Sequence, residues 1–192
     1  VRCALFRNKR QLLRHVPADG DQVLARARVS FYEPRGEFQL IIEHLEPAGA
    51  GSAQRAFEAL KRKLQAEGLF DTQRKRPLPA FPTRVGVITS PSGAAVRDVL
   101  QVLRRRAPHL AVTVYPAQVQ GQGAVDSLLE ALRTALDRRD CDVLVLTRGG
   151  GSIEDLAAFN DEQLARLIAA ATIPIVSAVG HEIDFSISDF VA

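Results

Sequence analysis

Short apolar runs alternate with amphipathic stretches from Arg84 onward, and this alternation limits the possible folds more than any other feature of the chain. The runs, rich in Val, Ile and Leu, are residues 84–90, 111–115, 141–147 and 173–179. The segments between them, 94–106, 124–138 and 153–171, have helical spacing, with a break near Asn160. Nearly continuous apolar strands separated by helices are typical of a parallel sheet covered on both faces. The sequence therefore predicts a Rossmann-like α/β domain over residues 84–192, with a further helix after Gly180.

The first fifty residues have a different pattern, that of a β-hairpin. Strands are predicted at 22–32 and 37–45, joined by a turn at 33–36 in which Pro34 presets φ and Gly36 tolerates a positive φ. Two or three strands cannot form a stable core alone, and we therefore expect this hairpin to be part of a small barrel. A helix over 53–67 and a proline-rich linker over 70–83 follow. The predicted organisation is a partial barrel over 1–50, a helix and linker over 51–83, and the α/β domain over 84–192.

Composition narrows the class of protein. With 46% hydrophobic residues among 192 the chain can bury a core, and its longest nearly apolar stretch, 167–180, is too short for a membrane span. Two cysteines make no disulfide framework, which favours the cytoplasm. The chain has no Met, so we expect it to be a piece of a longer protein. Basic residues cluster near the start, at 74–76 and at 104–106, which is typical either of solvated faces or of a polyanion partner.

The loop after the first strand of the α/β domain is a candidate anion site. Ser90, Ser92 and Gly93 precede a helix, where they offer an N-cap and exposed backbone N–H groups. The loop is neither a Walker A motif nor GxGxxG, so nucleotide binding has little support. Asp98 follows within the same helix, either as a functional carboxylate or as a favourable partner of the helix dipole.

The loop after the third strand is richer in glycine. Arg148 ends the strand and is followed by Gly149, Gly150, Gly151 and Ser152. Consecutive glycines let a phosphate approach backbone N–H groups, and an arginine can donate to two phosphate oxygens. The alternative is a flexible turn with a surface arginine.

The loop after the fourth strand contains His181 and Asp184. If a helix starts here, they share one face, and a His beside a carboxylate can act as a general acid or base near neutral pH. The spacing matches no HExxH zinc site. The alternative is a structural histidine.

Five ordered motifs resemble the large-subunit family of exonuclease VII, and with the hairpin the resemblance covers essentially the whole chain. They lie at residues 85–95 (VGVITSPSGAA), 115–116 with 119–121 (YP and VQG), 142–155 (DVLVLTRGGGSIED), 159–162 (FNDE) and 177–184 (SAVGHEID). The resemblance implies that the hairpin is the second half of an OB-fold β-barrel. It also implies degradation of single-stranded DNA from either end into oligonucleotides, together with several copies of a small helical subunit and without a membrane. The family's C-terminal helical region has no counterpart here.

Carried over by motif position, the family's catalytic set falls on Asp98, Arg148, His181 and Asp184. The chain departs from the family at Ile183, where Thr is common, and at Ala157 and Ala158, where many members have a bulky residue; neither change removes a charge. The resemblance implies no strict metal requirement, although Mg²⁺ can assist, and Asp98 and Asp184 are the candidate ligands.

Further candidates for DNA binding complete the hypothesis. Aromatic rings stack on unpaired bases, and basic side chains contact phosphates. The candidates are Phe31, Tyr32, Phe38, Arg74, Lys75 and Arg76. The alternative for the aromatic residues is barrel core. Two other functions stay open: a non-catalytic single-stranded DNA-binding module and an enzyme acting on a phosphorylated small molecule.

Overall fold

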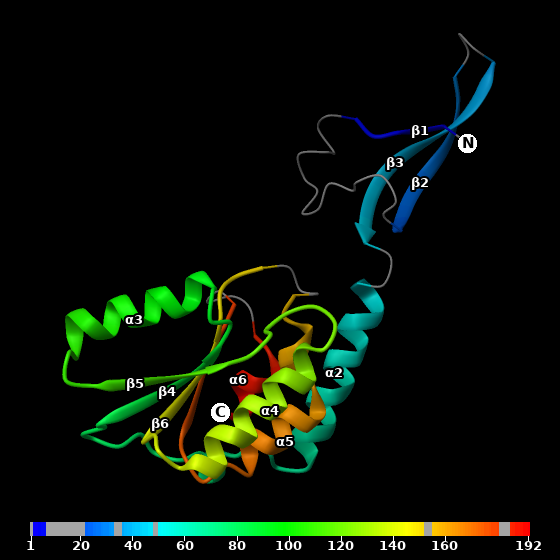
Figure 1. The fold of residues 1–192 in the computed structure, drawn as a ribbon. Helices are drawn as coiled ribbons and strands as arrows, with labels where there is room; N and C mark the ends of the chain where they lie inside the picture. The colour runs from blue at the N-terminus through cyan, green and yellow to red at the C-terminus, as the bar shows by residue number, and fades with distance from the viewer. Residues whose placement is uncertain (1, 7–21, 33–35, 48–49, 152–154, 181–184) are drawn as a thin grey trace. The chain divides into compact units, whose positions relative to one another are not determined.

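The computed structural model describes residues 2–6, 22–32, 36–47, 50–151, 155–180 and 185–192 (Figure 1). Residue contacts divide the chain into two compact units, Val1–Glu58 and Ala59–Ala192. The predicted turn residues 33–35 lie outside the described residues, as does most of the basic cluster near the start, Arg7, Lys9, Arg10 and Arg14.

The first unit is a three-stranded sheet. The predicted hairpin is confirmed: β2 (Val23–Tyr32) and β3 (Glu37–Pro47) pair antiparallel, with Gly36 at φ +64° in the turn. A short strand that the sequence did not predict, β1 (Arg2–Ala4), pairs parallel with β3 on the other side. Three residues are too few to show an alternating pattern. Ile42 is the one buried side chain in the described part of this unit, so its sheet has little core of its own.

The second unit is built on the predicted parallel sheet, which is confirmed. Its strands are β4 (Arg84–Thr89), β5 (Ala111–Pro116), β6 (Val143–Arg148) and β7 (Ile175–Val179), in the order β5-β4-β6-β7 and all parallel. Strand β5, which follows β4 in the sequence, lies on one side of β4, and β6 lies on the other side. The strand order therefore reverses between β4 and β6, where ligands bind in open α/β sheets.

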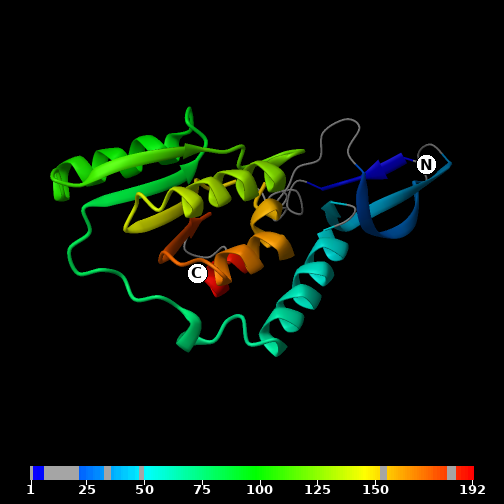
Figure 2. The same ribbon diagram turned by 60° about the horizontal axis from the view of Figure 1, so that its bottom comes forward.

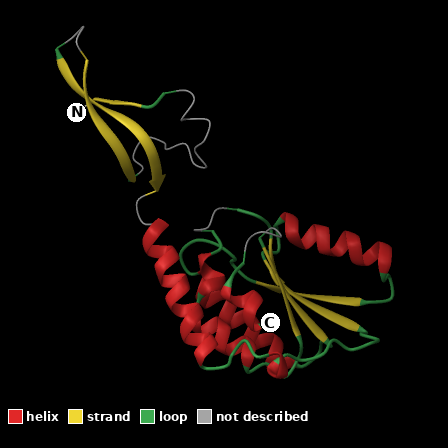
Figure 3. Ribbon diagram, turned by 180° about the vertical axis from the view of Figure 1, so that it is seen from behind, coloured by secondary structure: helices red, strands yellow, loops and turns green. Residues whose placement is uncertain are grey.

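Helices cover both faces of this sheet. Helix α3 (Ala94–Arg106) lies on one face, and α4 (Ala124–Arg138), α5 (Glu162–Ala169) and α6 (Ile187–Val191) lie on the other (Figures 1 and 3). The most deeply buried side chains of the unit include Val87, Ile88, Leu128, Leu132, Leu144, Leu146, Phe159 and Leu164. Gly86 leaves room for this packing, since a Cβ there would lie 2.5 Å from Leu144 Cδ2.

Helix α2 (Ala50–Ala66) and a long connection precede the sheet (Figure 2). Leu64 is fully buried, and ion pairs join Lys63 to Glu162 at 2.8 Å and Glu67 to Arg166 at 2.7 Å. These contacts hold the end of α2 against α5. The connection contains one short 3₁₀-helix, η2 (Thr72–Arg74). Within the described residues, no helix combines the length and the apolar character that crossing a membrane would need.

Two helical predictions need correction. The segment predicted as a helix over 153–171 contains a 3₁₀-helix, η3 (Ala157–Asn160), and then α5, while 153 and 154 lie outside the described residues. The break falls where predicted, because the Asp161 side chain accepts a hydrogen bond from Leu164 N (3.0 Å) and caps a new helix. The helix predicted after Gly180 begins only at Ile187, where Ser186 and Asp189 form a capping box.

Candidate active site at the carboxyl edge of the parallel sheet

The predicted site loops follow strands that end at one edge of the sheet. Because β4, β5, β6 and β7 are parallel and in register, their carboxyl ends lie side by side. Backbone hydrogen bonds continue between the loops: Ala117 N donates to Thr89 O (2.9 Å) and Gly180 N donates to Arg148 O (3.1 Å). The loops at 90–93 and 149–151 flank the point where the strand order reverses.

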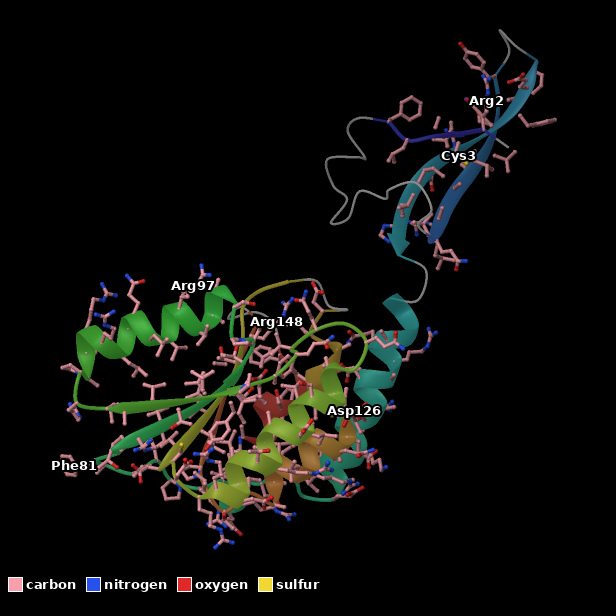
Figure 4. The ribbon with its side chains drawn as sticks, in the orientation of Figure 1. Arg2, Cys3, Phe81, Arg97, Asp126 and Arg148 are labelled. Atoms are coloured by element: carbon pink, nitrogen blue, oxygen red, sulfur yellow. The ribbon has the colours of Figure 1, made fainter. Side chains whose placement is uncertain are left out.

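Arg148 is the candidate site residue at this edge whose contacts are best defined. Its side chain is only 7% exposed, although it ends a strand next to glycines (Figure 4). Nη2 donates to Gln120 Oε1 (2.6 Å) and lies 3.4 Å from Asp155 Oδ2, while Nη1 donates to Gly149 O (2.8 Å). A buried arginine held by several acceptors is a positioned charge. The alternative interpretation of Arg148 as a surface arginine on a flexible turn is therefore wrong.

The glycines beside Arg148 differ in the space that they leave for a Cβ atom. A Cβ on Gly151 would overlap Arg148 Nη1 and would lie 2.6 Å from Nη2 and 2.7 Å from Cζ, so the guanidinium occupies the place of a side chain there. A Cβ on Gly149 would meet no atom within 4 Å. Gly149, Gly150 and Gly151 are exposed, whereas Ser152 lies outside the described residues. Gly151 thus makes room for Arg148, and the exposed backbone can approach an anion.

Gln120 was not predicted as a site residue. It lies in the loop after β5, which the Gln118 side chain shapes by donating from Nε2 to the carbonyl oxygens of Gln120 and Gln122, each at 2.9 Å. Gly121 (φ +78°) and Gly123 (φ +86°) supply the turns. Gln120 belongs to one of the motifs quoted above, but a lone glutamine carries no chemistry that a sequence pattern would single out. Asp155 was likewise part of a motif without an assigned role.

The loop after β4 matches the prediction in position. Gly93 is the N-cap of α3 and makes no side-chain cap, and Gly93 N donates to Ser90 O (3.2 Å). Ser92 is exposed and Ser90 is half-buried. Asp98 is exposed and is the fifth residue of α3, beyond the first turn, where no acidic residue occurs. This position weakens the helix-dipole explanation of Asp98, since that effect falls off after the first turn.

The loop with His181 and Asp184 lies outside the described residues, but both of its ends are held. Ser177 on β7 donates a hydrogen bond to Asp189 Oδ1 and lies 3.0 Å from Ser188 Oγ, which joins β7 to α6. Asp189 Oδ2 accepts from Ser186 N (2.7 Å), and Asn160 Oδ1 accepts from Ile187 N (2.8 Å). These contacts determine where the chain leaves the sheet and where α6 begins.

A second group of polar contacts precedes β6. Burial, together with hydrogen bonds to Asp140 and Cys141, raises the pKa of Tyr115. The backbone N–H groups of Arg84 and Thr83 lower the pKa of Asp142, whose carboxylate accepts from both at 2.9 and 2.6 Å. The contacts of Asp142 join the amino ends of β4 and β6, and the Tyr115 side chain connects β5 to the residues that precede β6.

The candidate DNA-binding residues are divided between the two units. In the first, Phe31 and Phe38 pair across the hairpin with ring centroids 5.3 Å apart, and both rings and Tyr32 are exposed, which does not favour a core role. In the second, Arg74, Lys75 and Arg76 are exposed, and Arg76 Nε donates to Ala171 O (2.7 Å). Because Ala171 precedes β7, this basic run lies toward the amino edge of the sheet.

No group of three His, Cys, Asp or Glu side chains that could hold a metal ion occurs among the described residues. Asp98 belongs to this part of the chain, whereas Asp184, the other candidate ligand, does not. A metal site is therefore not assigned.

Comparison with known proteins identifies the family. A sequence model described as exonuclease VII, large subunit, matches residues 69–192, and one described as an OB-fold nucleic acid binding domain matches residues 1–46. The chain is 63% identical over its full length to the exodeoxyribonuclease 7 large subunit of Thioalkalivibrio sulfidiphilus and 58% identical over 98% of its length to that of Alcanivorax borkumensis. It covers 43% and 42% of these two relatives, less than half of their lengths. The chain belongs to the exonuclease VII large-subunit family.

Proposed function

We propose that this chain carries the hydrolytic site of a nuclease that degrades single-stranded DNA from either end into oligonucleotides. The observation that carries the proposal is the buried Arg148 guanidinium, held beside exposed glycines where the strand order reverses, in a chain of this family. We further propose that it acts as the large subunit of a hetero-oligomer with several copies of a small helical subunit. We place it in the cytoplasm, because two cysteines in 192 residues make no disulfide framework.

Arg148 would bind the scissile phosphate. A guanidinium has five N–H donors in a planar fork, so it can hold Gln120 and Gly149 O and also donate to phosphate oxygens. Its charge would stabilise the negative charge that develops on those oxygens as water attacks. Because Gln120 and Asp155 hold the group in place beforehand, little reorganisation is needed at the moment of reaction.

The proton transfers are assigned to the loop after β7. His181 would take a proton from the attacking water, or deliver one to the sugar oxygen that leaves phosphorus, and Asp184 would orient the imidazole. Asp98 would position the water. Mg²⁺ would add Lewis-acid assistance where it binds, with Asp98 and Asp184 as candidate ligands.

The first unit would hold the strand. The exposed rings of Phe31, Tyr32 and Phe38 offer faces on which unpaired bases can stack, and the OB-fold match over 1–46 supports this role. Paired bases already stack on each other, so we expect preference for single strands.

End-labelled single-stranded and blunt duplex DNA test the proposal, using the complete large subunit with and without the small subunit, in Mg²⁺ or EDTA. We expect oligonucleotide products from both ends of single strands and none from the duplex. Equal cleavage of both substrates would contradict the stacking argument. Strand binding without products would identify a non-catalytic binding module, and no affinity for strands would favour an enzyme of phosphorylated small molecules.

Alanine variants of Asp98, Arg148, His181 and Asp184 test the residue roles. Each should abolish hydrolysis while the protein stays folded. Gln122→Ala is a matched control, because Gln122 takes part in shaping the neighbouring loop through its carbonyl oxygen, which alanine keeps. If the affinity for single strands falls in step with activity in all four variants, these residues bind DNA and do not catalyse its hydrolysis.

A further inference from the structure

An exposed aromatic ring directly follows the loop that carries His181 and Asp184. Phe185 is 66% exposed, and it follows Asp184 directly in the sequence. It belongs neither to the OB-fold part nor to any residue set assigned above. A large apolar side chain exposed next to a substrate site is a candidate for contact with the substrate.

The ring is held in place by the start of α6. Phe185 immediately precedes the N-cap Ser186, and Phe190 lies at the fourth helical position, so the two occupy the positions of a hydrophobic staple. Their ring centroids are 6.2 Å apart with planes tilted by 34°. The capping box of Ser186 and Asp189 fixes the adjoining backbone. Phe185 is thus anchored along one side while most of its surface faces solvent.

A staple alone does not account for this ring. Any apolar side chain satisfies the staple, yet here an aromatic residue has most of its surface exposed to water. The row continues on its other side: Phe190 and Phe70 have centroids 5.4 Å apart and a 36° tilt, and Lys61 Nζ lies 4.3 Å from the centre of the Phe190 ring. Aromatic faces beside a positive charge are the combination that binds single strands without sequence preference.

We propose that Phe185 is a base-stacking subsite of the second unit, which holds an unpaired base next to the phosphate being cleaved. The inference rests on the proposed function and adds a strand contact outside the OB-fold. A base stacked on Phe185 would keep the adjacent phosphate in register with the catalytic loop, while Lys61 would attract the phosphates of the neighbouring nucleotides. The ligand is a single-stranded polynucleotide of any sequence, because every base has a π-face.

The test separates stacking from the structural role of the staple. In the complete large subunit with its small subunit, Phe185→Leu keeps an apolar group at the staple position but removes the aromatic face, and Phe185→Trp restores one. Phe81→Leu is the control: Phe81 is 92% exposed and precedes β4, at the opposite edge of the sheet. Binding of single-stranded oligonucleotides is measured in a His181→Ala background, and cleavage in the otherwise unchanged enzyme. Each oligonucleotide is tested with normal bases and with an abasic nucleotide scanned along it.

For normal DNA we expect Phe185→Leu to weaken binding roughly 5- to 100-fold, the range that one base–aromatic stack contributes. Phe185→Trp and Phe81→Leu should bind as the parent does. With the abasic nucleotide at the stacked position, the difference between the parent and Phe185→Leu should disappear. The inference is overturned if Phe185→Leu binds and cleaves single strands as the parent does. It is also overturned if the affinity of Phe185→Leu is reduced by the same factor wherever the abasic nucleotide is placed. Failure of the parent enzyme to bind or cleave single strands would instead overturn the proposed function.

Discussion

Gly151→Ala should abolish the proposed nuclease activity by displacing one side chain. The added Cβ would overlap Arg148 Nη1 and would lie 2.6 Å from Nη2, whereas ordinary contact begins at 3.4 Å, so the guanidinium must move by more than the 0.8 Å that relieves the Nη2 contact alone. Its hydrogen bond to Gln120 is 2.6 Å long and will not survive such a shift unchanged. A misplacement of about 1 Å at a catalytic group costs on the order of a hundredfold in rate. We therefore expect kcat to fall by roughly that factor.

The loss should occur without unfolding. The atoms that must move are the far end of a flexible side chain, and the φ of Gly151 lies outside the left-handed region, so alanine fits its backbone. Thermal unfolding and single-turnover cleavage of labelled single-stranded DNA would be measured together in the complete subunit. Gly149→Ala is the comparison, because its Cβ meets no atom within 4 Å, and it should cost clearly less activity. If Gly151→Ala retains the parent kcat, the position of the Arg148 guanidinium does not matter for catalysis and the argument fails.

Three further predictions concern other contacts. Gln120→Leu should lower kcat by roughly 10- to 100-fold, because the charged Arg148 guanidinium loses the acceptor of one of its hydrogen bonds. Gln120→Glu keeps an acceptor at this position and should keep most of the rate. Gln122→Leu should have the kcat of the parent. Gly86→Ala should reduce the free energy of unfolding in urea by about 1–3 kcal/mol, since its Cβ would overlap the β6 side chain it packs against; an unchanged midpoint would contradict that packing. The pKa of Asp142 is lower in the folded protein than in the unfolded chain, where it is about 3.9. The ionised carboxylate therefore stabilises the fold above about pH 3.9, and this stabilisation is lost as the pH falls through the pKa of the folded state. Asp142→Asn should accordingly lose less stability than the parent protein between about pH 5 and pH 3.

The parallel sheet could be predicted because its pattern is local. Each strand from β4 to β7 is a run of Val, Ile and Leu between polar loops, and α3 and α4 have the predicted bounds. Loops at the carboxyl ends of parallel strands lie at one edge whatever the strand order. The sequence alone therefore places Arg148 and the loop after β4 at one edge of the sheet.

The helix between β6 and β7 could be predicted only in part. Apolar spacing predicts one long helix with a break. The new helix, α5, begins where it does because the side chain of Asp161 caps it. Asn160 adds a contact to Ile187, far along the chain. Local spacing carries no information about such a partner.

Tertiary structure alone decided what holds the site together. The strand order β5-β4-β6-β7 lets the loop after β5 reach Arg148, so a glutamine with no chemistry of its own becomes the partner of a buried charge. The same is true of the room that Gly151 leaves for the guanidinium and of the staple that holds the exposed Phe185. Hydrophobic periodicity determines which segments become strands and helices, because burial of one face is a local property of the sequence. The neighbours of each side chain depend on the packing of segments distant along the chain, and only the folded protein specifies them.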